Sequence, residues 1–177
     1  MRRLRYCVAA SLDGFIAGPN DENDWIVSDP SFDFAALWAQ FDTLLMGRRT
    51  YEVAIKRLPD LKNMGKRLVV VSTTLEEEPG ATIVRDNIPE AVAKLKAEPG
   101  KDIWLMGGGM LFRTLLDAEL VDAVEVSFMP VLLGSGVPLL PRGNRAQLHL
   151  KNCTVMPSGT ALLLYSVLSP NHGPAQM

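Results

Sequence analysis

The sequence predicts a single α/β domain of three layers, with a mostly parallel central sheet and an antiparallel hairpin at its C-terminal end. Short apolar runs rich in β-branched residues alternate along the chain with segments of helical spacing. The run at 67–71 shows no polar alternation, which is typical of a strand buried on both faces of a parallel sheet. The last two strand-like runs, at 147–156 and 160–168, are separated by Pro157-Ser158-Gly159, a turn suited to antiparallel strands.

The strands are predicted from apolar runs that end at glycine, proline or polar turn residues. They are the runs at 4–10, 43–46, 67–71, 82–84, 103–106, 123–128, 147–156 and 160–168. The stretch after the first strand, 13–33, is rich in Gly, Pro, Asn and Asp, which indicates a loop.

The helices are predicted from apolar residues three and four positions apart, at 34–41, 50–57, 89–96 and 110–116. Asp33 is a suitable cap for the first of them. Pro89 lies in the first turn of the third, and Pro99-Gly100 follows its end, which is the usual order of helix start and stop residues. Strands that alternate with such helices indicate parallel pairing.

The composition argues against a nucleic-acid or membrane partner. The 177 residues carry a formal net charge of −2, so the chain has no basic footprint for either surface. No apolar window reaches the roughly 18 residues of a membrane span. Cys7 and Cys153 lie in apolar runs without metal-ligand spacing, which predicts buried free thiols, no metal site and a cytoplasmic location. We expect one domain over residues 1–168 and a flexible tail at 169–177.

The most informative segment is 103–112, where a buried strand runs into Gly107-Gly108-Gly109 and then into a helix. Glycine has no Cβ, so another molecule can approach the bare peptide closely. The first N–H groups of the following helix are free and favour a phosphate. The segment therefore indicates a nucleotide cofactor, and the alternative is a glycine-rich turn that serves packing alone.

Three other strand ends carry unusual residues, and ligands of open α/β sheets bind beyond the carboxyl ends of the strands. The first strand ends in small residues around Ala9, and the second runs into Gly47-Arg48-Arg49-Thr50. Two guanidinium groups there can grip phosphate, although an ordinary solvated pair is the alternative. The third strand ends in Ser72-Thr73-Thr74, whose hydroxyls can take ribose or phosphate oxygens or can cap a turn.

These motifs resemble those of the dihydrofolate reductase-like superfamily in order and spacing over residues 4–168. They are Asp13-Gly-Phe-Ile-Ala17, Leu45-Met-Gly-Arg-Arg-Thr-Tyr51, Val70-Val-Ser72 and Met106-Gly-Gly-Gly109. The stretch from Pro130 to Leu139 is similar to the branch that contains the reductase domain of riboflavin biosynthesis. The resemblance implies an NADPH-dependent reductase of the 5-amino-6-(5-phosphoribosylamino)uracil reductase type, which transfers hydride to a small pterin-like or pyrimidine-like heterocycle.

The resemblance also implies roles for residues at matching positions. Ala9 and Ile16 would border the nicotinamide. Separately from the resemblance, we expect Trp25 and Phe112 to contact the substrate. The phosphates and the adenosine end would be held by Gly47, Arg48, Arg49, Thr50, Ser72 and Thr73. The strand-to-helix turn would add Met106, Gly107, Gly108, Gly109, Met110 and Leu111. Because Met110 stands where a basic residue often helps with the 2′-phosphate, Arg48 and Arg49 would carry that charge.

A carboxylic acid in a partly apolar pocket has a raised pKa and can deliver the proton that accompanies hydride addition. Asp29 and Asp33 are both candidates, since the spacing after Trp25 places neither one alone at the expected position. A helix cap is the alternative for Asp33. Trp25 and Phe32 are candidates to wall the substrate ring, whereas Trp38 is predicted to lie in the core.

Two classes of function remain open from the sequence: a reductase, and a non-catalytic or regulatory nucleotide-binding module that keeps the fold. Oxidation of NADPH in the presence of a pterin or aminopyrimidine distinguishes them. We also expect a homodimer, because the apolar stretch 128–141 and the terminal hairpin offer a surface and an edge, and relatives in this branch commonly form dimers.

Overall fold

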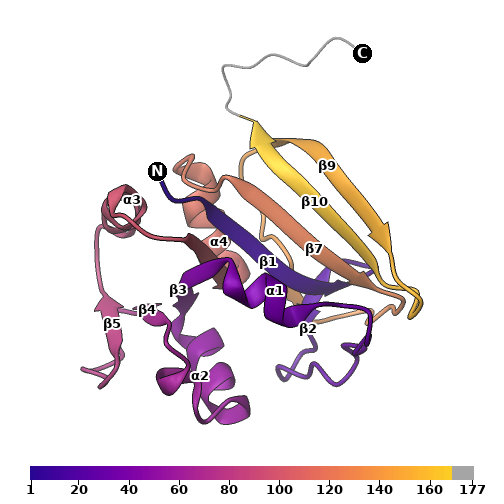
Figure 1. Ribbon diagram of the computed structural model, residues 1–177, viewed down its shortest axis with the longest axis horizontal. Coiled ribbons are helices and arrows are strands. Elements are labelled where there is room, and N and C mark those ends of the chain that lie inside the picture. Colours follow the sequence, from indigo (N-terminus) through magenta and orange to yellow (C-terminus); the bar gives the residue numbers. More distant parts are fainter. Residues whose placement is uncertain (169–177) are drawn as a thin grey trace.

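The computed structural model describes residues 1–168, so the predicted tail at 169–177 lies outside the described residues. Eight strands form one sheet in the order β5-β4-β3-β6-β1-β7-β10-β9 (Figure 1). The strands of this sheet are β1 Leu4–Ser11, β3 Phe41–Gly47, β4 Arg67–Val71, β5 Ala81–Val84, β6 Asp102–Gly107, β7 Ala123–Met129, β9 Gln147–Val155 and β10 Ala161–Leu168. The helices are α1 Phe34–Ala39, α2 Arg48–Arg57, the short 3-10 helix η1 Leu61–Asn63, α3 Ile88–Ala97 and α4 Gly109–Asp117.

The pairing confirms the predicted fold class. Strands β5, β4, β3, β6, β1 and β7 run parallel to their neighbours, and β10 and β9 add to β7 as an antiparallel hairpin. A second, two-stranded sheet of β2 (Phe15–Ala17) and β8 (Val137–Pro138) was not predicted. Segments of two and three residues are too short to show a periodicity, so β2 falls within the stretch 13–33 that is predicted to be a loop.

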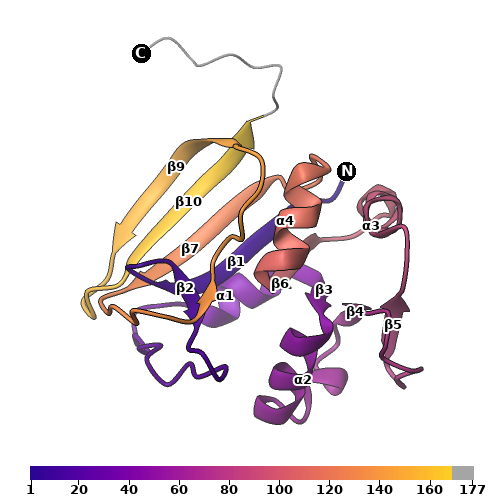
Figure 2. The ribbon, with the colours of Figure 1, turned by 180° about the vertical axis from the view of Figure 1, so that it is seen from behind.

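Helices cover both faces of the parallel part of the sheet, which gives the three layers. Leu4 and Tyr6 of β1 pack in one apolar core with α3 and α4. The alternate residue Cys7 points to the other face, into a second core with Tyr51 of α2 and Trp104 of β6. Figure 1 shows α1 in front of the sheet, and Figure 2 shows α4 in front of it from behind. None of the helices in the described residues is long and apolar enough to cross a membrane.

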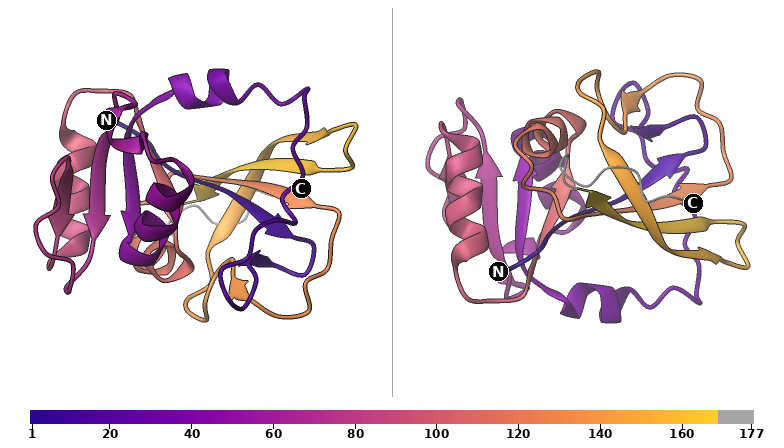
Figure 3. Two further views of the ribbon diagram at one scale, coloured as in Figure 1. Left: turned by 90° about the horizontal axis from the view of Figure 1, so that it is seen from below. Right: turned by 90° about the horizontal axis from the view of Figure 1, so that it is seen from above.

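Two expectations about individual residues are wrong. Phe41 does not end the first helix but begins β3, where its ring is fully buried. Cys153 is exposed rather than buried, because β9 is the outer strand of the sheet and every one of its residues is exposed. Cys7 is buried and free, as predicted. The hairpin of β9 and β10 lies at the end of the sheet opposite to β5 (Figure 3).

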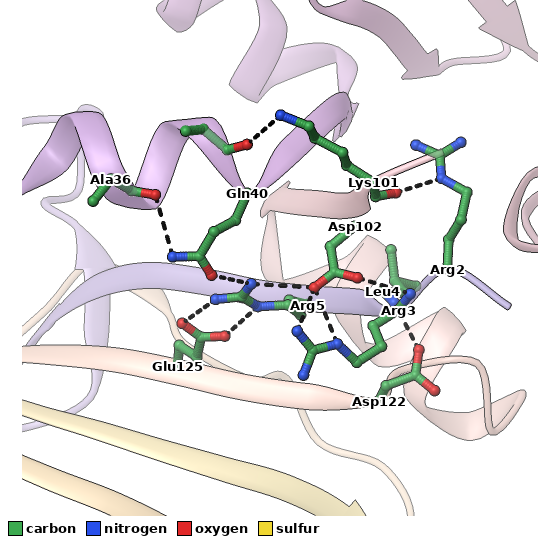
Figure 4. Close-up of polar contacts among 11 residues, drawn as sticks. Arg2, Arg3, Leu4, Arg5, Ala36, Gln40, Lys101, Asp102, Asp122 and Glu125 are labelled. Carbon is green, nitrogen blue, oxygen red and sulfur yellow. Dashed lines mark hydrogen bonds and ion pairs between the residues drawn. The ribbon is translucent and has the colours of Figure 1, made fainter. Parts of the chain in front are cut away.

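A charged network holds the beginning of β1 between its neighbours (Figure 4). Arg5 donates from Nε to Oε1 of Glu125 on β7 at 2.5 Å and from Nη2 to Oε2 at 2.9 Å. Its Nη1 donates to Oε1 of Gln40 at 2.7 Å and to Oδ2 of Asp102 on β6 at 3.2 Å. The side chains of Arg5 and Glu125 are only 6% and 10% exposed. This bidentate pair is therefore a buried ion pair with its hydrogen bonds satisfied.

Replacement of Glu125 by alanine is expected to lower the free energy of unfolding by about 3–5 kcal/mol, because it leaves the buried Arg5 guanidinium without its main partner. Urea denaturation at neutral pH measures the change. The control is Glu98→Ala, which removes a half-exposed ion pair with Arg67 and should cost under about 1 kcal/mol. Equal losses of unfolding free energy in the two variants would contradict the claim that the buried Arg5–Glu125 pair stabilises the position of β1.

Candidate functional site

A cleft of about 860 Å³ opens at the carboxyl ends of the parallel strands. Because β4, β3, β6 and β1 are neighbours in the sheet, their carboxyl ends lie along one edge. The unusual ends of β1, β3 and β6 line the cleft, whereas β4 contributes Val71 rather than the predicted hydroxyl residues. Most of the predicted cofactor residues line the cleft: Ala9, Ile16, Gly47, Arg48, Arg49, Thr50, Met106, Gly108, Gly109, Met110 and Leu111. Gly107, Ser72 and Thr73 are not part of the lining.

Two glycines of the lining are not required by the packing of the protein itself. Gly47 has φ −77°, and a Cβ built on it would have its nearest neighbour, the backbone N of Gly108, at 3.8 Å. A Cβ on Gly108 would lie 3.7 Å from Oγ1 of Thr50. Both distances are ordinary van der Waals contacts, so a methyl group at Gly47 or Gly108 would take up space in the cleft without a clash. These two positions form a cradle of bare peptide that suits a close ligand.

Gly109 differs from Gly47 and Gly108, because the packing of the protein leaves no room for a side chain at this position. A Cβ at Gly109 would lie 2.8 Å from the carbonyl oxygen of Pro138 and 2.9 Å from Cδ of Pro141. The segment with these prolines presses against the start of α4. For this glycine the packing alternative raised from the sequence is the correct one.

The cradle lies between two helix N-termini. Helix α2 begins at Arg48 and α4 at Gly109, and no side chain within residues 1–168 caps either N-terminus. Such free N–H groups carry the positive end of the helix dipole and bind anions well. Arg48 and Arg49 add two guanidinium groups at the same place, with side chains 51% and 64% exposed. The arrangement fits the phosphates of a dinucleotide.

The loop between β2 and α1 supplies lining residues that the sequence did not predict. Asp21 forms an ion pair with Arg49, with Oδ2 2.7 Å from Nε. Asn23 also lines the cleft, and its Oδ1 is buried without a hydrogen-bond partner among the described residues. The loop has no periodicity, so no local pattern predicts a role for either residue.

Comparison with known proteins identifies the family to which this chain belongs. The model of the RibD C-terminal domain matches residues 2–162, which is most of the chain. The chain belongs to the RibD C-terminal domain family. An uncharacterised protein of Bacillus subtilis (strain 168), YyaP, is 37% identical to it over 93% of this chain and 94% of that protein.

Solved structures agree with this assignment. A Shewanella sp. PV-4 protein provisionally named for riboflavin biosynthesis superposes with a TM-score of 0.81 at 27% identity, over 96% of this chain and 100% of that one. A Thermotoga maritima diaminohydroxyphosphoribosylaminopyrimidine deaminase/5-amino-6-(5-phosphoribosylamino)uracil reductase shares the fold, with a TM-score of 0.71 at 16% identity. That match covers 94% of this chain and 57% of the other.

In this RibD C-terminal domain the hydroxyl of Ser72 stabilises the turn that follows β4. Its Oγ accepts hydrogen bonds from the backbone N–H groups of Thr74 at 3.2 Å and Leu75 at 2.9 Å. Ser72 is also buried, whereas Thr73 is exposed. The turn-cap alternative therefore accounts for Ser72.

Neither candidate acid lies in the cleft lining. Asp33 caps α1, where its Oδ1 accepts from the N–H of Ala36 at 2.8 Å. Asp29 accepts from the N–H and Oγ of Ser31 and from the N–H of Ser158, at 2.6–2.9 Å. These hydrogen bonds from Ser31 and Ser158 hold the pKa of Asp29 well below its usual range. The expectation of a raised pKa is thus wrong for Asp29, whose carboxylate ties its loop to the β9–β10 turn.

The two predicted substrate residues also lie outside the lining. Phe112 belongs to the core, with its ring 3% exposed and stacked on Tyr6 at a centroid distance of 3.8 Å. Trp25 donates from Nε1 to the carbonyl oxygen of Glu22 at 3.1 Å. The aromatic residue in the lining is Trp104. Strand alternation is the signal that could have found it, since Trp104 shares a face of β6 with Met106.

Replacement of Asp29 by asparagine is expected to lower stability at pH 7 and to matter less in acid. A carboxyl group whose folded pKa is lowered stabilises the fold above its unfolded pKa of about 3.9, and this contribution fades as the pH falls below that value. Urea denaturation at pH 7 and pH 3 measures the gap between wild type and variant, which should shrink in acid. Asp24→Asn, at an exposed position of the same loop, is the control. A gap that stays constant with pH would refute the prediction.

Proposed function

We propose that this protein is an NADPH-dependent reductase of a small pterin-like or pyrimidine-like heterocycle. The observation that carries the proposal is the cradle of Gly47 and Gly108, which the packing leaves bare between two uncapped helix N-termini. Membership of the RibD C-terminal domain family supports the same chemistry, because the Thermotoga maritima protein that shares this fold is named as a deaminase/reductase.

In this proposal the charged residues of the cleft bind the phosphates of the cofactor and the apolar residues contact its nicotinamide ring. Arg48, Arg49 and the N-termini of α2 and α4 would bind the phosphate groups, with Thr50 beside them. The apolar residues Ala9 and Ile16 would border the nicotinamide ring. The reduced nicotinamide supplies the hydride when the cofactor is bound. Apolar lining residues exclude water from that end of the cleft and fix the ring in position.

Replacement of Gly47 by alanine is expected to weaken NADPH binding by about tenfold or more, because the methyl group occupies the cradle. The fold should persist, with a change in unfolding free energy under about 1 kcal/mol at this extended N-cap position. Calorimetric titration gives the Kd and thermal unfolding gives the stability. Gly109→Ala is the contrast, expected to lose stability through the contact with Pro138. A wild-type protein that binds no NADPH would falsify the proposal.

A second candidate function is a nucleotide-binding module without catalysis. The observation that favours it is the position of Asp29 and Asp33, which leaves Asp21 as the only carboxylate in the described lining, paired with Arg49. Loss of NADPH absorbance upon addition of pterins or aminopyrimidines supports the reductase. NADPH binding with no oxidation by any compound of the panel supports the module.

We also propose that the protein is a cytoplasmic homodimer, assembled through the terminal hairpin and the stretch 128–141. Leu148 and Leu150 on the edge strand β9 are 42% and 48% exposed, and Leu132 in the preceding stretch is 68% exposed. An exposed edge strand with apolar side chains is a surface for another chain.

Leu150→Lys is expected to shift the dimer to a monomer, because a lysine on the apolar face of β9 would have to be desolvated in the interface. Sedimentation equilibrium at micromolar concentration measures the mass. His149→Lys adds the same charge on the opposite face of the strand and should leave the dimer intact. A wild-type protein that sediments as a monomer contradicts the assembly.

A further inference from the structure

We propose that the second ligand of the cleft is an uncharged, planar heterocycle without a phosphate group, recognised through a ring N–H by the amide of Asn23. This inference rests on the proposed reductase function and names the substrate class for the same site. It separates this chain from a reductase that acts on a phosphoribosylated pyrimidine.

The charges of the cleft are concentrated at one end. Among the described lining residues the charged side chains are Asp21, Arg48 and Arg49. Arg48 and Arg49 open α2 beside the glycine cradle, where the phosphates of the cofactor would lie, and Asp21 already neutralises part of Arg49. A second phosphate group would find no further cation among the described lining residues and would be repelled by the phosphates of the cofactor.

One part of the lining, formed by β1, β6 and the loop after β2, holds no cation among the described residues, and we call it the β1–β6 wall. It consists of Cys7, Val8, Ala9, Asn23, Ile26, Trp104 and Met106. Burial is the main cause that raises the pKa of Cys7, so this thiol is neutral at physiological pH. The nearby buried cation on the same face is Arg5, and its guanidinium is held by Glu125, Gln40 and Asp102. It cannot bind a ligand without breaking that network.

The β1–β6 wall includes the amide of Asn23, whose Oδ1 is buried and has no partner among the described residues. A buried acceptor without a donor is costly, and nearly all such groups in proteins are satisfied. The indole N–H of Trp104 is already used, because it donates to the carbonyl oxygen of Cys7 at 2.8 Å. Trp104 therefore offers a ligand only apolar ring surface, whereas Asn23 accepts from an N–H group. A flat ring with an N–H at its edge matches both.

The test compares one ring with and without its phosphate. The protein is first titrated with NADPH and then, saturated with NADP⁺, with 5-amino-6-(5-phosphoribosylamino)uracil or with the same compound after phosphatase treatment. We expect that removal of the phosphate leaves the Kd unchanged or lowers it. A Kd that rises about threefold or more upon phosphate removal overturns the inference, as does absence of binding of both compounds at millimolar concentration. A protein that binds NADPH but gives either result refutes this inference and leaves the cofactor proposal standing.

Variants of Asn23 test the recognition of the ring. Asn23→Ala should raise the Kd of the dephosphorylated compound about tenfold while the Kd of NADPH is unchanged. Asn23→Asp keeps an acceptor at the same place and should retain most of the affinity. Asn152→Ala, on the exposed strand β9, is the matched control and should change neither Kd. An unchanged Kd in Asn23→Ala, or an equal loss for NADPH, overturns the role of Asn23.

Discussion

The buried ion pair between Arg5 and Glu125 fixes the register on which the rest of the structure depends. Strand β1 lies in the middle of the sheet, with Arg5 opposite Ala123 and Cys7 opposite Glu125 on β7. A slip of one residue would turn Arg5 toward the apolar core under α4, where it would have no partner. The ion pair therefore permits one register of β1, and that register decides which residues reach the other end of the strand.

The same strand thus contributes a stabilising ion pair at its beginning and lining residues of the cleft at its end. Two to four positions beyond Arg5, Cys7, Val8 and Ala9 line the cleft. Parallel neighbours carry their own carboxyl ends to the same edge, which is why Gly47 and Gly108 face each other although they are far apart in the sequence. Bare peptide, helix N-termini and guanidinium groups meet there because the parallel order of the strands requires it.

Sequence reasoning succeeded where one local pattern decides the outcome. The run 67–71 has no polar alternation and is strand β4 with the same limits. The strand ends at Gly47 and Gly108 could be placed in one cleft from the alternation of strands and helices. Sequence reasoning failed where the partner of a side chain is determined by the tertiary structure. Asp29 bonds to Ser158, 129 positions away, and the ring of Phe112 stacks on Tyr6 rather than on a ligand. Asn23 lies in a loop whose path depends on contacts that no periodicity reveals.

The contact of Gly109 with Pro138 and Pro141 changes how glycines in relatives of this chain should be compared. A relative that has abandoned its nucleotide would still retain glycine at position 109, because the proline segment forbids a methyl group there. Position 47 is under no such restraint and is free to drift once the ligand is gone. On the proposed function, the residue at position 47, rather than the number of glycines after β6, would therefore distinguish relatives that bind the nucleotide from those that keep only the fold.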